Sequence, residues 1–150
     1  DEAALRAGWD RLHTNIAGHA PGLTLDGVLV EEMVQPGLEL VIGAKRDPNW
    51  GPMVLVGLGG VWIEVLRDSR LMPADVSLAR AKAEILSLKS ARLLGPFRGQ
   101  PARDVDAVAE VAVRLGALMR ANPQILEVDI NPLVVHAEGA VALDALFVTE

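Results

Sequence analysis

Residues 127–148, which read EVDINPLVVHAEGAVALDALFV, constrain the fold more than any other part of the chain. Val, Ile and Leu recur on both sides of the sequence HAEG, a pattern that predicts two antiparallel strands joined by a short turn. A turn centred on residues 137–138 pairs Asn131 directly with Asp144. The Cβ atoms of directly paired residues lie about 4.5–5.5 Å apart, so we expect these two side chains to lie close together.

The polar residues of the first predicted strand share one face. Because side chains alternate across a strand, Glu127, Asp129 and Asn131 project to one side. Val128 and Ile130 project to the other side. Burying carboxylates and an amide costs free energy unless a partner binds them. We therefore expect the polar face either to be open to solvent or to bind a ligand.

The pairing of Asn131 with Asp144 suggests a metal site. A carboxylate and an amide oxygen at cross-strand distance can share one hard cation. Mg²⁺ that is bound to a nucleotide usually takes only one or two oxygens from the protein. Alternatively, the two side chains only form hydrogen bonds on a solvated sheet face. The pattern by itself leaves both interpretations open.

The composition limits the classes of function. With 150 residues, 51% of them apolar, the chain is long enough for one compact domain over residues 1–150. A net charge of −6 and scattered basic residues argue against a nucleic-acid partner. No apolar stretch is long enough to span a membrane, and the absence of cysteine suits a cytoplasmic protein. Because the chain opens with Asp1 rather than Met, we expect it to be a piece of a longer protein.

The remaining pattern predicts an α+β fold, with a largely antiparallel sheet and helices packed on one face. Consecutive hairpins favour this class, because strict alternation of strands and helices is missing. The expected elements are a helix over residues 3–16, strands over 25–34 and 38–45 joined by a turn at 35–37, a hairpin over 53–66 that bends at Gly59–Gly60, helices over 74–90 and 105–121, and the hairpin over 127–148.

The two predicted central helices carry more specific expectations. Asp104 is a plausible N-cap for the helix that ends near Ala121. In the preceding helix, helical spacing selects five side chains as core contacts, namely Val76, Leu78, Ala83, Ile85 and Leu86.

Three acids flank the first predicted hairpin, namely Glu31, Glu32 and Glu39. Taken alone, they are most simply solvent-facing carboxylates at the ends of strands. The sequence GLGG at residues 57–60 lacks the spacing of a dinucleotide-binding fingerprint and the Lys-Ser/Thr pair of a P-loop. On spacing alone we interpret it as a tight hairpin turn.

Four segments, taken together and in order, point to a known family. They are GVLVEEMVQPGLELVIGAKRDPNWGPMVLVGLGGVWIEVLRD from Gly27, LLGPFRGQPARD, EVDINPLVV and VALDA. This series resembles the ATP-grasp domain of NDP-forming acyl-CoA synthetases and, more distantly, the β subunit of succinyl-CoA synthetase. An ATP-grasp fold clamps a nucleotide between two α+β subdomains. This chain resembles only the second, C-terminal subdomain.

The resemblance implies roles for residues near the adenine and in the glycine-rich segment. Glu31 occupies the hinge position where the chain meets the adenine, and Val34 lies on the same hinge. Glu39 matches an acid that contacts the nucleotide. The family's glycine-rich strand pair is matched by Gly59, Gly60 and Glu64.

The resemblance also implies a metal and a catalytic role. Asn131 and Asp144 match the two ligands of Mg²⁺, the same pair that the hairpin register selects. Asp129 stands where succinyl-CoA synthetases carry a catalytic glutamate near the phosphohistidine. The implied reaction converts acid, CoA and ATP into acyl-CoA, ADP and phosphate. The acid is not specified; it could be acetate, another short acid or an aromatic acid such as ferulate.

Several parts of such an enzyme are missing from these residues. The phosphate-binding lysine belongs to the first ATP-grasp subdomain, and the phosphohistidine and the CoA site belong to another domain or subunit. These are therefore the expected partners, besides the nucleotide. One alternative is a regulatory ATP-grasp-like domain fused to a protein acetyltransferase, and another is a plain α+β interaction module. Retention of Asp129, Asn131 and Asp144 favours catalysis.

Overall fold

The computed structural model describes residues 1–60 and 67–150, which form two compact units, Asp1–Met33 and Val34–Glu150. The first unit contains helix α1 (Glu2–His19), which confirms the helix predicted over residues 3–16. The Asp1 carboxylate accepts a hydrogen bond from the amide of Ala4 at 2.8 Å and caps the helix. None of the residues of α1 is buried.

The strand predicted over residues 25–34 is not formed. Residues 23–37 have no regular secondary structure, and the side chains of Leu29 and Met33 are 81% and 90% exposed. An apolar run becomes a strand only where a neighbour accepts its hydrogen bonds. The next segment, which was its predicted hairpin partner, pairs on both sides with other strands. The first hairpin was therefore predicted wrongly.

The second unit is built on one antiparallel sheet. Its strands are β1 (Leu38–Asp47), β2 (Gly51–Leu58), β3 (Ser69–Pro73), β4 (Ile125–Val135), β5 (Ala140–Ala142) and β6 (Ala145–Thr149). The strand order is β3-β2-β1-β4-β5, and β6 also pairs with β4. The predicted hairpin over residues 53–66 is represented by β2, because its second half lies outside the described residues.

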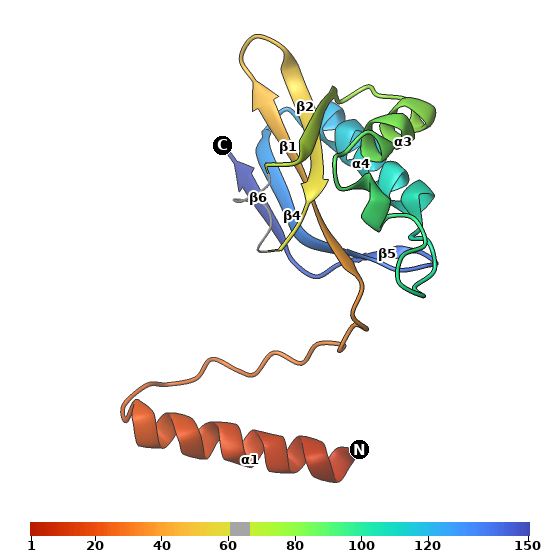
Figure 1. Cartoon of the computed structure of the whole chain (residues 1–150). Helices are drawn as coiled ribbons and strands as arrows, with labels where there is room; N and C mark the ends of the chain where they lie inside the picture. Colours follow the sequence, from red (N-terminus) through yellow and green to blue (C-terminus); the bar gives the residue numbers. More distant parts are fainter. Residues whose placement is uncertain (61–66) are drawn as a thin grey trace. The chain divides into compact units, whose positions relative to one another are not determined.

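Two helices, α3 (Leu78–Leu86) and α4 (Val105–Ala121), lie on the same side of the sheet (Figure 1). A short 3₁₀ helix, η1 (Ala91–Leu93), connects them through an irregular segment. The side chains that are fully buried between helices and sheet include Ile42, Val54, Ile85, Met119 and Val128. The predicted α+β class with helices on one face is confirmed.

Helix α3 is shorter than the helix predicted over residues 74–90. It begins after the N-cap Ser77 and ends at Leu86. Val76 and Ile85 are buried as predicted, but three predicted core side chains, Leu78, Ala83 and Leu86, are exposed. The helix turns Ala81 and Ile85, four residues apart, toward the core instead.

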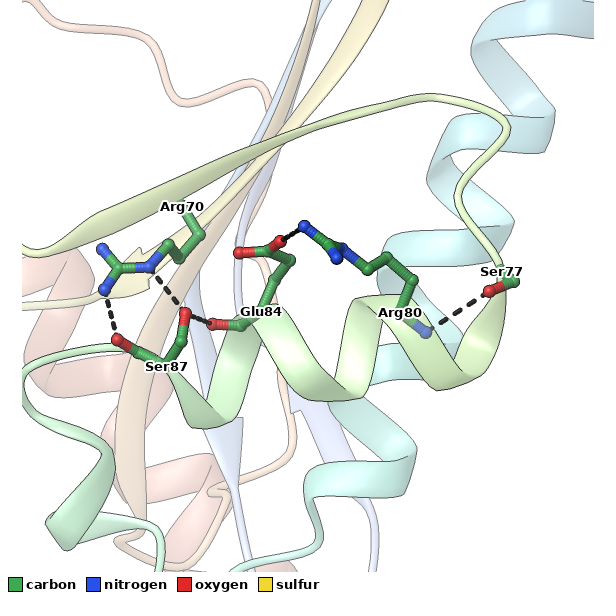
Figure 2. A network of polar contacts seen from close by, with 5 residues as sticks. All are labelled: Arg70, Ser77, Arg80, Glu84 and Ser87. Carbon is green, nitrogen blue, oxygen red and sulfur yellow. Dashed lines mark hydrogen bonds and ion pairs between the residues drawn. The ribbon is translucent and has the colours of Figure 1, made fainter.

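Polar contacts fasten α3 to the neighbouring strand (Figure 2). Arg70 on β3 donates from Nε to the hydroxyl of Ser87 at 2.7 Å and from Nη2 to the backbone carbonyl of the same residue. Along the helix, Arg80 pairs with Glu84, one turn away. The two bonds from Arg70 fix the C-terminal end of α3 against the edge of the sheet.

Candidate functional site

The register of the C-terminal hairpin agrees with the sequence prediction. Strand β4 pairs with β5 and β6 so that Leu133 faces Ala142 and Ile130 faces Ala145. Between these pairs, the amide of Asn131 donates to the carbonyl of Asp144 at 3.3 Å. Asn131 and Asp144 therefore lie opposite each other on adjacent chain segments. The second strand of the hairpin differs from the prediction only in being divided into β5 and β6.

A β-bulge marks the same position on the other side of β4. Leu40 pairs with Leu133 and Ile42 pairs with Ile130, so two residues of β4 lie opposite the single residue Val41. A bulge of this kind redirects side chains locally. Here it lets Ile130 and Leu133 both contribute to the core although they are an odd number of residues apart.

The sheet face opposite α3 and α4 is called here the open face. Because Ile42, Ala44 and Val128 point into the core, alternation places Gly43 and Asp129 on the open face, where they form a directly paired row across β1 and β4. Val128 and Ile130 belong to the core side, as predicted. Asp129 and Asn131 are both partly exposed.

The polar residues of the open face follow one another along the sheet. Glu39, which pairs with Val134, comes first, and Asn131 with Asp144 comes next. Asp129 follows, and then Glu127, whose carboxylate pairs with Lys45 on β1 at 2.9 Å. Residues two apart on a strand are separated by about 6.6–6.8 Å. The face therefore presents the predicted nucleotide-contacting acid, the predicted metal pair and the predicted catalytic acid in linear order.

Glycines bring the chain close to Glu39. A pocket of about 320 Å³ is lined by Glu39, Gly59 and Gly60 together with Gly37, Leu38, Leu58 and Leu93. The amide of Gly59 donates to the carbonyl of Glu39 at 2.9 Å. A Cβ on Gly60, whose φ is +63°, would lie 2.8 Å from Oε2 of Glu39. Gly59 and Gly60 therefore allow a close approach to Glu39, a function that our interpretation of GLGG as a hairpin turn did not include.

A second pocket adjoins Asp129. It measures about 260 Å³ and is lined by Gly43, Ala44, Lys45, Met53, Leu55, Leu71, Glu127, Val128 and Asp129. A Cβ added to Gly43 would lie 3.9 Å from Oδ1 of Asp129. The absence of a side chain at Gly43 therefore keeps one side of this carboxylate accessible. Sequence reasoning missed Gly43, because its partner across the sheet, Asp129, is distant in the chain.

Asp104 connects the hairpin to α4. Its Oδ1 accepts from the amide of Ala107 at 2.9 Å, which confirms it as the N-cap of the helix, and its Oδ2 accepts from the amide of Gly139 at 2.8 Å. These hydrogen bonds hold the pKa of the Asp104 carboxyl below its usual value. The backbone amide of Asp104 donates to the carbonyl of His136 at 2.8 Å. The turn that sets the register of the hairpin is thus anchored to the helix.

The donor set at Asn131 and Asp144 fits a hard cation held mainly by other ligands. Both residues offer oxygen atoms, and Asp144 is exposed. One of its carboxylate oxygens accepts from the amide of Ala145 at 2.8 Å, and the other accepts no hydrogen bond from the residues that the structure describes. Within the described residues, no cluster of three or more His, Cys, Asp or Glu could enclose a metal ion. Such a site therefore needs a ligand that brings oxygens of its own.

Three other residues were predicted to belong to the site, namely Glu31, Val34 and Glu64. Glu31 is exposed and belongs to the first unit, and the partly buried Val34 is the first residue of the second unit. Glu64 lies outside the described residues.

In the described part of the chain, no helix combines the length and hydropathy needed to cross a membrane.

Comparison with known proteins found a matching family and related enzymes. A family model described as an ATP-grasp domain matches residues 1–148. The chain is 43% identical over 148 residues to a trans-feruloyl-CoA synthase from an unknown prokaryotic organism, covering 97% of this chain and 21% of that protein. It is 34% identical over 145 residues to the β subunit of an ADP-forming acetate–CoA ligase I of Pyrococcus furiosus, covering 97% of this chain and 62% of that subunit.

A solved structure has the same fold. It is the dinucleotide-forming acetyl-coenzyme A synthetase 1 of Ca. Korarchaeum cryptofilum, in complex with coenzyme A and Mg-AMPPCP, with its phosphohistidine segment pointing towards the nucleotide binding site. The TM-score is 0.75 at 37% identity, and the match covers 78% of this chain and 55% of that one. The chain therefore spans only part of the length of each of these relatives.

Proposed function

Because this chain belongs to the ATP-grasp family, we propose that its 150 residues are the C-terminal subdomain of an ATP-grasp domain and form half of a site for ATP or ADP with Mg²⁺. The family match over residues 1–148 supports this proposal. So does the nucleotide analogue with magnesium in the related Ca. Korarchaeum enzyme. A nucleotide cleft binds by closing on its ligand from two sides, and the first subdomain supplies the second side.

The whole protein then catalyses the conversion of acid, CoA and ATP into acyl-CoA, ADP and phosphate. The relatives named as ADP-forming acetate–CoA ligases and as a trans-feruloyl-CoA synthase support this activity. The CoA site and the phosphohistidine lie in another domain or subunit, which is the proposed partner of this chain. We place the enzyme in the cytoplasm.

The order of side chains on the open face supports a proposed role for each of them. Asn131 and Asp144 hold the magnesium ion, which neutralises negative charge on the phosphates when it is bound. Glu39 contacts the nucleotide on one side of this pair, and Asp129 lies on the other side. At that position the Asp129 carboxylate accepts a hydrogen bond from the imidazole N–H of the histidine that becomes phosphorylated, which another domain or subunit supplies. This bond orients the ring for in-line attack on the phosphate. The opposition of Asn131 and Asp144 is the single observation that carries the proposal.

Calorimetry with Mg-ATP tests the shared site. The chain alone is compared with the same chain joined to its first subdomain, and the second protein is expected to bind at least about tenfold more tightly, because each new charged contact to phosphate contributes about 1.5–3 kcal/mol. The variant Asp106→Asn, which changes an exposed carboxylate paired with Lys82, is the control for unspecific effects of charge. Equal affinities of the two proteins would contradict the proposal.

A further inference from the structure

The backbone at Arg67 adopts a conformation that side chains rarely take. Its φ is +46°, in the left-handed region, and among the described residues other than glycine only Arg98, with φ +48°, shares this feature. An arginine gains nothing from such a backbone by itself. Residues held in this region cluster at functional sites, where the surroundings fix them.

The neighbour of Arg67 shows what fixes it. Asp68 is 5% exposed, and its carboxylate accepts from the amides of Lys89 at 2.9 Å and Ser90 at 2.6 Å. Its carbonyl accepts from the amide of Leu58 at 3.2 Å. Burial raises the pKa of the Asp68 carboxyl, but the hydrogen bonds from Ser90 and Lys89 outweigh it and leave the pKa below its usual value. Asp68 is thus a buried, charged anchor that fixes the backbone directly after Arg67.

Arg67 lies beside the row of the candidate metal pair. It lines a pocket of about 200 Å³ together with Val41, Gly57, Leu58, Asp68 and Ser69. Ser69 pairs with Gly57, Gly57 pairs with Val41, and Val41 lies opposite the bulge at Asn131. Because Arg67 and Val41 line the same pocket, and neighbouring strands are about 4.8 Å apart, Arg67 lies across one small pocket and one strand spacing from the row of Asn131.

The charges on the open face favour a cation at this point. Glu39, Asp129 and Asp144 are acids, and Lys45 is paired with Glu127 at 2.9 Å. Polyphosphate is anionic, and one magnesium ion neutralises only part of its charge. A guanidinium binds phosphate oxygens through two parallel hydrogen bonds, which makes arginine suited to this position.

We propose that Arg67 is a phosphate-binding residue of the nucleotide site, which contacts the β- or γ-phosphate beside the metal held by Asn131 and Asp144. The inference rests on the proposed function and adds to it a cation supplied by this half of the cleft. The anchor at Asp68 fixes the chain next to Arg67, and the pocket that Arg67 shares with Val41 places it beside the row of the metal pair.

The test measures dissociation constants of ATP and AMP, with Mg²⁺, for the full-length protein. The variants Arg67→Gln and Arg67→Gly are expected to weaken ATP binding by at least about tenfold while AMP binding changes by less than about twofold, because AMP lacks the contacted phosphates. Arg67→Lys keeps the charge and is expected to lose less. Arg98→Gln is the matched control, since it also removes an exposed arginine with a positive φ.

Each outcome decides between the possibilities. If Arg67→Gly binds ATP with wild-type affinity while Arg67→Gln binds it more weakly, the effect comes from the backbone, and the proposal is overturned. ATP and AMP affinities that fall equally, or an Arg67→Gln protein with unchanged ATP affinity, would also overturn it. If Asp144→Asn is impaired while Arg67→Gln is not, only this inference fails. If the wild-type protein does not bind Mg-ATP at all, the proposed function fails with it.

Discussion

Replacing Gly60 by alanine separates the stability of the fold from the geometry of the site. At Gly60 the φ is +63°, and an added Cβ would lie 2.8 Å from Oε2 of Glu39. The left-handed backbone costs a residue with a Cβ about 1–2 kcal/mol. The carboxylate is the free end of an exposed side chain and can rotate away at little cost. We therefore expect the free energy of unfolding to fall by about 1–2 kcal/mol, with Glu39 displaced from its position.

The neighbouring glycine provides the contrast. A Cβ on Gly59 would lie 2.8 Å from the carbonyl carbon of Leu40 and 2.9 Å from that of Glu39, both of them backbone atoms in β1. Backbone in the middle of a sheet cannot move as a side chain does. Overpacking of this kind costs about 1–3 kcal/mol, and the same shift opens the hydrogen bond from Gly59 to Glu39. Gly59→Ala is therefore expected to lower stability with a larger change in the fold.

A double-mutant cycle on the full-length protein makes the reasoning testable. Urea denaturation gives the free energy of unfolding, and calorimetry gives the affinity for Mg-ATP, for Gly60→Ala, Glu39→Gln and the double variant. If Gly60 acts through the carboxylate, both single variants weaken nucleotide binding and the double variant is no weaker than Glu39→Gln. Additive losses in affinity, or a Gly60→Ala protein with wild-type affinity, would refute this coupling.

Three further expectations follow from the same structure. Arg46 donates to three backbone carbonyls where α4 ends and β4 begins, the shortest bond being 2.7 Å, so Arg46→Met is expected to lower the free energy of unfolding by about 1.5–3 kcal/mol in urea denaturation. The pKa values of Asp68 and Asp104 are lowered in the folded protein. The stability that these carboxylates contribute is therefore present above their unfolded pKa, near 4, and is lost as the pH falls through the folded values. In Asp68→Asn, the free energy of unfolding is expected to depend less steeply on pH between about pH 6 and pH 2. Glu31→Ala is expected to weaken nucleotide binding with an unchanged melting temperature, since Glu31 is exposed, and a lower melting temperature with unchanged affinity would assign it a structural role.

The hairpin could be predicted from the sequence because its information is local. The turn lies between two strands that are adjacent in the chain, and its length alone sets the opposition of Asn131 and Asp144. The N-cap at Asp104 is local in the same sense, since its partner Ala107 lies three residues away. Predictions of this kind were correct in position as well as in type.

The errors have non-local causes. The apolar run over residues 25–34 has strand composition, but strand formation depends on a partner elsewhere in space, and the predicted partner pairs with β2 and β4 instead. The face of α3 depends on where Ser77 starts the helix, which periodicity alone did not fix. The roles of Gly43 and Gly60 depend on contacts with Asp129 and Glu39, which belong to other strands.

The central claim is that Asn131 and Asp144 together hold the metal of a nucleotide site, and magnesium dependence tests it most directly. In the full-length protein, Asp144→Asn removes one negative charge with almost no change in volume, and Asn131→Leu removes the amide oxygen. We expect both variants to keep their melting temperature and to need at least about tenfold more Mg²⁺ for half-maximal phosphoryl transfer, as lost charged contacts imply. The control Asp106→Asn keeps the wild-type requirement. An Asp144→Asn enzyme with unaltered magnesium dependence would contradict the account.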